Sequence, residues 1–266
     1  MKDFKKAFSE IKYFLLDMDG TVYLGDDLIG CMNHTLDILR AAGKKIVYLT
    51  NNSSKTAEEY ESKLIRLDLF RSGDIVYTSG MATAEYLSEF FPDKTVNVLG
   101  TKALKKSFEA DGVKVCDRGA DVCVLAYDTE LTYKKLCDFC YDLKKGAKYL
   151  ATHPDVNCPA PEVFVPDAGA FMAMIEKSTG KVPETIVGKP NFIMGDRLKK
   201  RFGAGKSEFI MVGDRLHTDI KFGNNCGFYT ALVLSGESTA DDIRSSDAEP
   251  DFIFDSLNDV VKYIIN

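Results

Sequence analysis

Residues 14–21 read Phe-Leu-Leu-Asp-Met-Asp-Gly-Thr, an apolar run that ends in two carboxylates separated by one residue. A short continuous apolar run is typical of a strand buried at the centre of a parallel sheet. In open sheets of this kind, ligands bind outside the carboxyl ends of the strands. Two acids at that edge suit the binding of a hard divalent cation and the attack of a carboxylate on phosphorus. A strand that simply ends in a solvated Asp-Gly turn has the same pattern.

Two further segments carry groups that suit phosphate. The apolar run Ile46–Leu49 ends in hydroxyls and amides, of which Thr50 and Asn51 offer donors to phosphate oxygens. We expect Ser53 or Ser54 to cap the helix that follows. Far along the chain, the sequence Gly-Lys-Pro at 188–190 combines a residue that allows close backbone approach with a compact positive charge.

A last segment repeats the pattern of the first. The apolar run 209–212 ends at Gly213-Asp214, and a second acid, Asp219, follows five residues on. We expect Asp219 in the first turns of the next helix, where it can orient Asp214 or a bound ion. All four segments lie at the end of an expected strand or in the loop beside one, and their chemical groups are complementary.

Together these segments resemble the four motifs of the haloacid dehalogenase superfamily of phosphotransferases. Asp17 and Asp19 match its first motif, Thr50 its second, Lys189 its third, and Asp214 with Asp219 its fourth. The segments 17–23, 49–53, 188–190 and 212–220 narrow the resemblance to the NagD-like, p-nitrophenyl phosphatase-type subfamily. The resemblance runs from residue 12 almost to the C-terminus.

The resemblance implies a Mg²⁺-dependent phosphatase that works through an aspartyl-phosphate. It implies that Asp17 is the nucleophile and that Asp19 is the general acid and base. The implied metal ligands are Asp17, Asp214 and the backbone carbonyl of Asp19, with Asp219 in a supporting position. The implied phosphate-binding residues are Gly20, Thr50, Asn51, Asn52 and Lys189, and of these Thr50 and Lys189 are also implied to be catalytic.

Strand and helix signals alternate along the chain, as a parallel α/β sheet requires. We expect a Rossmann-like, doubly wound parallel sheet core in two parts, residues 1–81 and 184–266. The interval 82–183 is too long and too regular for a loop, because it has strand signals at 96–99, 122–126 and 149–151 and helix signals at 102–109 and 133–144. The sequence therefore predicts an inserted α/β domain, and in the resembled subfamily a C2-type cap occupies this interval.

Within the insert, the segment 152–169 is expected to contact substrate through Asp155, Asn157 and Asp167. For His153 we favour a role in fixing the turn over direct substrate contact. The segment departs from the commoner Pro-Gly of the subfamily by having Asp167 after a proline. The prolines expected to stiffen it are Pro159, Pro161 and Pro166. The helix that follows, 170–177, is apolar on most sides and suits burial between domains.

Composition limits the function classes. The chain has 266 residues, 45% of them hydrophobic and 28% charged, with a net charge of −6. These values argue against a broad basic surface for a nucleic acid polymer. The sequence shows neither a signal peptide nor a membrane-spanning run, so we expect a cytoplasmic protein. Seven cysteines are scattered, and Cys137-x-x-Cys140 lacks the second pair of a zinc site.

Alternative interpretations of these motifs assign the chain to other classes of protein. A non-catalytic phosphate-ligand binder predicts loss of at least one of the four central charged residues, and all are present: Asp17, Asp19, Lys189 and Asp214. A dehalogenase or phosphonatase differs at the position of Asp19, and an ion pump needs membrane spans. A phosphoryl transferase or phosphomutase stays open, because the sequence does not identify the acceptor. The expected substrates are small sugar, nucleotide or related metabolite phosphates, and a homodimer through the cap is a family-level expectation.

Overall fold

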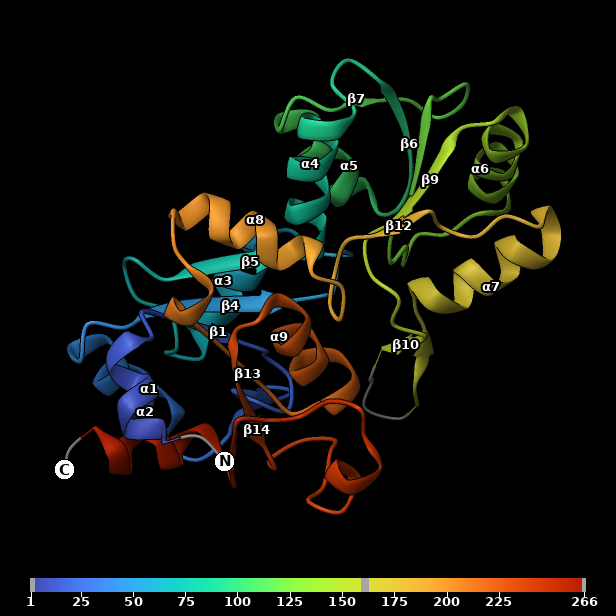
Figure 1. Ribbon diagram of the computed structural model, residues 1–266. Helices are drawn as coiled ribbons and strands as arrows, with labels where there is room; N and C mark the ends of the chain where they lie inside the picture. The colour runs from blue at the N-terminus through green and yellow to red at the C-terminus, as the bar shows by residue number, and fades with distance from the viewer. Residues whose placement is uncertain (1–2, 159–162, 265–266) are drawn as a thin grey trace. The chain divides into compact units, whose positions relative to one another are not determined.

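The computed structural model describes residues 3–158 and 163–264, which form two compact units. The first unit contains the residues up to Thr50, then Ala57–Tyr77, and then those from Leu198 onward. The second unit contains Asn51–Thr56 and Thr78–Arg197 (Figure 1). The second unit is thus wider than the insert 82–183 expected from the sequence, and it takes in a short segment that precedes that insert.

The first unit is built on a six-stranded sheet with the order β15-β14-β13-β1-β4-β5. The chain starts this sheet at β1, moves outward through β4 and β5, and later returns to β13 beside β1 before moving outward in the other direction. The strand order therefore reverses between β1 and β13, which is where open α/β sheets bind their ligands. The strands are β1 (Tyr13–Leu16), β4 (Lys45–Thr50), β5 (Ile75–Thr78), β13 (Phe209–Gly213), β14 (Tyr229–Val233) and β15 (Phe252–Phe254).

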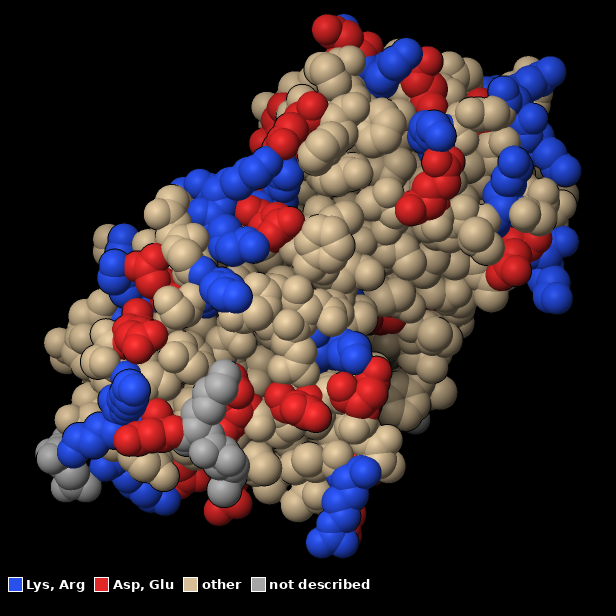
Figure 2. Space-filling model, in the orientation of Figure 1, with Lys and Arg blue, Asp and Glu red and all other residues tan. Residues whose placement is uncertain are grey.

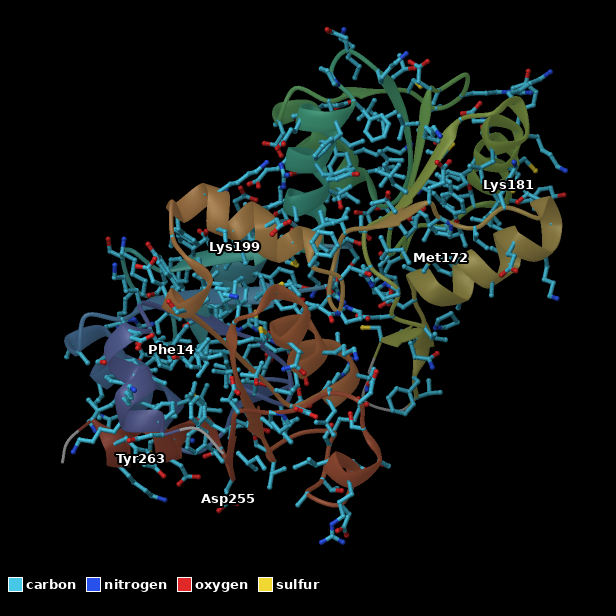
Figure 3. All side chains as sticks on the ribbon, viewed as in Figure 1. Phe14, Met172, Lys181, Lys199, Asp255 and Tyr263 are labelled. Carbon is cyan, nitrogen blue, oxygen red and sulfur yellow. The ribbon has the colours of Figure 1, made fainter. Side chains whose placement is uncertain are left out.

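Strand β1 lies at the centre of this sheet because every one of its residues is apolar and buried. It pairs in parallel with β4 and β13, and the register places Leu16 opposite Tyr48 on one side and Val212 on the other. Phe14 is completely buried in the core (Figure 3). The helices of the unit are α1 (Phe4–Glu10), α2 (Met32–Ala41), α3 (Ala57–Arg66) and α9 (Lys221–Cys226), and α8 (Ile193–Phe202) crosses the boundary between the units.

The second unit has a five-stranded parallel sheet with the order β12-β9-β8-β6-β7. Its strands are β6 (Thr95–Leu99), β7 (Lys114–Val115), β8 (Val122–Leu125), β9 (Lys148–Ala151) and β12 (Thr185–Ile186), and its helices are α4 (Ser79–Phe90), α5 (Lys102–Ala110), α6 (Tyr133–Lys145) and α7 (Ala168–Thr179). Alternate strand residues point to opposite faces. Val122 and Val124 pack with α4 and α5, whereas Cys123 and Leu125 pack with α6 and α7. The predicted α/β fold with parallel sheets and flanking helices is confirmed.

Helix α7 differs from expectation in two ways. It begins already at Ala168, because the Asp167 carboxylate accepts a hydrogen bond of 2.5 Å from the Ala168 N–H and caps the helix. The apolar sequence suits burial between domains, whereas the helix is buried along a single face. Only Ala168, Ile175 and Thr179 are buried, and Met174 is 41% exposed, because a single face of the helix packs on the core.

The segment 51–56 is anchored to the second unit, and the expected capping role of Ser53 or Ser54 is wrong. Ser53 is completely buried, and its Oγ accepts a hydrogen bond of 3.0 Å from the Tyr127 N–H. The same hydroxyl lies 3.1 Å from the hydroxyl of Thr152, and the carbonyl of Ser54 accepts from Thr101 at 3.0 Å. These partners follow β6, β8 and β9, so the segment occupies the carboxyl edge of the second sheet.

The described chain also contains two short hairpins, β2 (Tyr23–Leu24) with β3 (Asp27–Leu28), and β10 (Asn157–Cys158) with β11 (Val165–Pro166). Figure 2 shows positive and negative side chains interspersed over one face of the molecule, in agreement with the modest net charge of −6. Among the described residues, no helix combines the length and the apolar character needed to cross a membrane.

The anchoring of Ser53 gives a stability prediction. Ser53→Ala leaves the buried Tyr127 N–H without its acceptor, which costs about 1–3 kcal/mol in the free energy of unfolding. The matched control is Ser88→Ala in α4 of the same unit, where the hydroxyl bonds only to the carbonyl of the preceding turn on an exposed surface. We expect that control to stay within about 0.5 kcal/mol. Calorimetry of both variants tests this, and equal stability of the two would contradict the anchoring role.

Candidate active site

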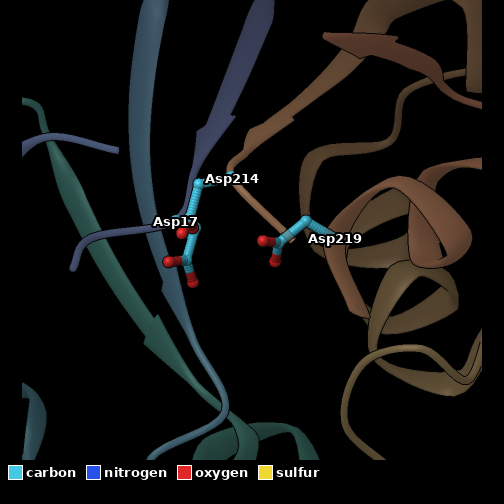
Figure 4. A group of neighbouring side chains, drawn as sticks. All are labelled: Asp17, Asp214 and Asp219. Carbon is cyan, nitrogen blue, oxygen red and sulfur yellow. The ribbon is translucent and has the colours of Figure 1, made fainter. Parts of the chain in front are cut away.

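Three carboxylates meet at the point where the order of the first sheet reverses. Asp17 directly follows β1, Asp214 follows β13, and Asp219 comes from the short π-helical segment η2 (Leu216–Ile220). One oxygen from each of the three side chains lies within 4.8 Å of the others. Figure 4 shows Asp219 pointing from its helical segment toward Asp17 and Asp214. The expectation that the paired acids and the later acids gather at one edge thus agrees with the structure for these three residues.

Two glycines allow the backbone to approach Asp214 closely. Gly20 has a φ of +87°, and a Cβ at this position would lie 2.5 Å from Asp214 Oδ2. A Cβ on Gly236 would lie 2.1 Å from the same atom. Both distances are far shorter than any real contact, so a side chain at either position would displace the carboxylate. The Gly20 carbonyl also accepts a hydrogen bond of 2.8 Å from the hydroxyl of Ser235.

The loop 235–238 after β14 is a part of the site that our sequence reasoning missed. The Glu237 N–H donates to Asp214 Oδ2 at 2.8 Å, and the Ser238 N–H donates to the Asp214 carbonyl at 3.1 Å. The Glu237 carboxylate pairs at 2.9 Å with Nε of Arg215. A signal existed, because Ser-Gly-Glu-Ser follows an apolar run at 229–233, the same pattern that located the other strand ends.

The electrostatics of Asp214 favour a bound cation. Burial and then the negative charge of Asp17 raise the pKa of Asp214, although the Glu237 N–H and Arg215 oppose this. Its Oδ1 is buried and has no hydrogen-bond partner. A buried carboxylate oxygen without a donor, close to two other carboxylates, suits a hard divalent cation. The residues present therefore fit the implied metal.

The cluster of carboxylates differs in one detail from the expected set of metal ligands. Asp17 and Asp214 are both in the cluster of carboxylates, and Asp219 lies with them although we expected it in a supporting position. It also accepts a hydrogen bond of 3.2 Å from the Arg215 N–H. The expected contribution of Asp19 is its backbone carbonyl, which stays a prediction.

Asp19 has the accessibility that a proton donor needs. Its side chain is exposed, while the backbone around it is ordered by a hydrogen bond of 2.8 Å from the Gly20 N–H to the Tyr23 carbonyl. Partial burial of the carboxyl raises the pKa of Asp19, and the charges of Lys63 and Arg215 oppose the shift. A raised carboxyl pKa favours the protonated form, which is the form that can donate to a leaving group.

In the second unit, Asn51 is hydrogen-bonded to two residues that lie far apart in the sequence, one in the insert and one in the third motif. Its Nδ2 lies 3.1 Å from both carboxylate oxygens of Asp155 and 2.9 Å from the carbonyl of Lys189. Its Oδ1 accepts from the Lys189 N–H at 2.9 Å. Lys189 is 1% exposed and precedes Pro190 through a cis peptide bond.

His153 lies between the two acids expected to contact substrate. The side chain is completely buried, with Nδ1 3.6 Å from Asp155 and Nε2 3.6 Å from Asp167. Burial lowers the pKa of His153, but the attraction of Asp155 and then Asp167 outweighs it, so the net direction is upward. Burial alone would raise the pKa of Asp155. The interactions with His153 and Asn51 outweigh burial, so the pKa of Asp155 is lowered.

The other expected site residues have local roles that the structure describes. Thr50 ends β4 in the first unit and is buried. The side-chain oxygen of Asn52 accepts from the N–H and hydroxyl of Ser54. Asn157 is exposed in β10. Pro159 and Pro161, expected to stiffen the segment, lie outside the described residues.

Comparison with known proteins agrees with this arrangement. Residues 14–114 match the family model of the haloacid dehalogenase-like hydrolases, and residues 186–260 match a second HAD-hydrolase-like model. An acid sugar phosphatase of Staphylococcus aureus (strain MRSA252) is 35% identical over 95% of this chain and 97% of that protein.

Solved structures are similar over nearly the whole chain. The 4-nitrophenylphosphatase of Thermotoga maritima is 44% identical, with a TM-score of 0.92 over 96% of this chain and 98% of that one. A NagD-like structure is 43% identical, with a TM-score of 0.89 over 97% of this chain and 99% of that one. The chain therefore belongs to the haloacid dehalogenase-like hydrolases, in their NagD-like p-nitrophenyl phosphatase group, and is a phosphatase that acts on phosphoric monoester bonds.

Proposed function

We propose that this phosphatase hydrolyses small metabolite phosphates, sugar phosphates among them, through an aspartyl-phosphate on Asp17 and with Mg²⁺ as its cofactor. The cluster of Asp17, Asp214 and Asp219 at the reversal point of the sheet carries the proposal. It combines a half-buried carboxylate at a strand end with a buried carboxylate oxygen that lacks a donor. The acid sugar phosphatase and the 4-nitrophenylphosphatase similar to this chain support the substrate class.

The reaction divides into two displacements at phosphorus. Asp17 Oδ attacks the phosphoryl group, an O–P bond forms, and the bond to the leaving oxygen breaks. Asp19 gives its proton to that oxygen, which the raised pKa of its carboxyl favours. Asp19, now ionised, takes a proton from water as the water attacks phosphorus. This second step releases inorganic phosphate and restores the Asp17 carboxylate and the Asp19 acid.

Asp17 and Asp214, with Asp219 beside them and the Asp19 carbonyl, are the residues that would hold the metal. When bound, Mg²⁺ supplies positive charge that offsets the repulsion between an anionic nucleophile and an anionic ester. The chain's own part is to keep these oxygens close together. The Glu237 N–H holds Oδ2 of Asp214, so its Oδ1 is left for the ion.

The charge of the transferring group needs donors and a cation. We assign this role to Thr50, Asn51 and Lys189, with backbone donors at Gly20 and Asn52. The side chain of Asn51 already uses both its amide and its carbonyl on protein partners, which favours its backbone N–H for the phosphate. We further propose that residues 82–183 act as a cap that admits small esters, with Asp155, Asn157 and Asp167 affecting the choice among them.

The nucleophile is tested by Asp17→Asn. We expect kcat on p-nitrophenyl phosphate to fall by about 10³-fold or more, because an amide cannot form the covalent intermediate. Asp19→Asn should be nearly as damaging and should accumulate phosphorylated protein, which intact-mass spectrometry detects. The control is Asp241→Asn, whose carboxylate is 92% exposed. If Asp17→Asn keeps more than about a few per cent of the wild-type rate while folded, the assignment is wrong.

The metal is tested by Asp214→Asn. Removing one of three neighbouring charges relieves repulsion, so in the presence of a chelator we expect this variant to melt above the wild type. Mg²⁺ at one hundred times its Kd should stabilise the wild type by about 2.7 kcal/mol and the variant much less. We also expect Ca²⁺ to support little activity, because it prefers more ligands than this cluster offers.

Asp241→Asn again serves as the control, since it removes a charge without touching the cluster. Calorimetry with and without Mg²⁺ gives the melting temperatures, and phosphate release gives the activity. Full activity after exhaustive chelation, or a Mg²⁺ shift of equal size in Asp214→Asn, is incompatible with this site.

A further inference from the structure

His153 stands apart from the other two histidines of the chain. His34 and His217 are exposed, whereas His153 is completely buried. Each ring nitrogen faces a different carboxylate at 3.6 Å, and neither makes a hydrogen bond. At this separation a charged ring attracts both acids at once. A neutral ring would remove the positive charge that faces both carboxylates in a largely buried place, which is costly.

The two carboxylates flank one hairpin at its base, one before the first strand and one after the second. Asp155 precedes β10, and Asp167 follows β11. The backbone closes the same end, because the Asp167 N–H donates to the Val156 carbonyl at 2.9 Å and the Gly169 N–H donates to the Asp155 carbonyl at 2.8 Å. One imidazole ring therefore ties both ends of the hairpin together through their side chains.

The ring is also connected to the lysine proposed to bind phosphate. Asp155 accepts from Asn51, and Asn51 bonds to both the N–H and the carbonyl of Lys189. Only two residues thus lie between His153 and the backbone of Lys189. A change in the position of the Asp155 carboxylate acts on the Asn51 amide and through it on that backbone.

We propose that His153, as an imidazolium, is a positioning residue that fixes the base of the β10–β11 hairpin to the Asn51–Lys189 pair and so sets the preference among substrates. The inference rests on the proposed function and deepens it. It also gives Asp155 and Asp167 a defined task, since both hold the ring that orders the hairpin. His153 itself acts through these neighbours.

The charged groups that face the ring determine its behaviour with pH. Asp155 and Asp167 favour the proton, and Lys189 and burial oppose it, with a net upward shift in the pKa of His153. The charged ring is thus present at low and neutral pH and is lost as the pH rises through its pKa in the folded protein. Above that pKa the two carboxylates lose their shared partner, and substrate preference should weaken.

The first test observes the ring directly in the full-length wild-type protein. Long-range ¹H–¹⁵N spectra distinguish an imidazolium, with two protonated nitrogens, from either neutral tautomer. Spectra of His34→Gln and His217→Gln identify the signals of the exposed residues, so the third belongs to His153. We expect an imidazolium at pH 7, and a neutral ring at that pH would overturn the proposal.

The second test measures preference, as the ratio of kcat/KM on a sugar phosphate to kcat/KM on p-nitrophenyl phosphate. We expect His153→Gln to lower this ratio about tenfold, because a small misplacement of positioning groups has a large effect on rate. His34→Gln, an exposed histidine, should leave the ratio unchanged. If His153→Gln does not fold, His153→Asn replaces it, and the ring spectrum of the wild type still decides the question.

A double variant separates positioning by charge from simple packing. His153→Gln removes the positive charge that faces both carboxylates, so adding Asp167→Asn should relieve the repulsion and recover part of the lost ratio. Asn at 167 can still cap α7. If the ring only filled space, the two losses would add. An additive result, or an unchanged ratio in folded His153→Gln, would overturn the proposal.

These outcomes differ from a failure of the proposed function. A wild type that releases no phosphate from p-nitrophenyl phosphate contradicts that function, and with it the inference built on it. A wild type that is active, while His153→Gln keeps its substrate ratio, contradicts only the role of His153.

Discussion

Repulsion among three neighbouring carboxylates is the constraint on which the site in the first unit depends. Asp17, Asp214 and Asp219 meet within 4.8 Å because parallel strands β1 and β13 end side by side. Nothing in the hydrophobic core requires this arrangement, and it is costly without a cation. The surroundings reflect that cost. The Glu237 N–H donates to Asp214 and the Arg215 N–H donates to Asp219. Two glycines let the chain close around Asp214, and Arg215 is paired with Glu237.

In the second unit the buried groups are two basic side chains, those of Lys189 and His153. Lys189 is 1% exposed and His153 completely buried, and each is surrounded by groups that can share its charge or fix its backbone. Asn51 is well suited to the connecting position, because an amide can donate and accept at once and stays neutral. A carboxylate in its place would add charge next to Asp155, and a hydroxyl could not reach three partners. The network therefore depends on one residue type at its centre.

The long apolar runs predicted most of the fold, because burial on both faces of a parallel strand leaves a continuous signal in the sequence. The sequence does not predict strands of two residues, such as β7 and β12, because so short a run shows no hydrophobic periodicity. Sequence reasoning gives Ser53 a local capping role, because its partner Tyr127 is distant in the chain. The residues proposed to act in catalysis can be found from the sequence, because they resemble known motifs. The roles of His153 and the 235–238 loop depend on neighbours that only the folded chain brings together.

The path of the chain through the two units has a practical consequence for dissecting this protein. The second unit is discontinuous, because Asn51–Thr56 belongs to it although Ala57–Tyr77 does not. Cutting out residues 78–197 as a free fragment would strip the carboxyl edge of its sheet, exposing the Tyr127 N–H and the Thr101 hydroxyl that Ser53 and Ser54 now cover. Exchanging the second unit between related proteins would also uncover this edge of the sheet if only residues 78–197 were exchanged. An exchange that transplants the hexapeptide together with the larger segment keeps this edge covered, whereas a single-crossover graft does not.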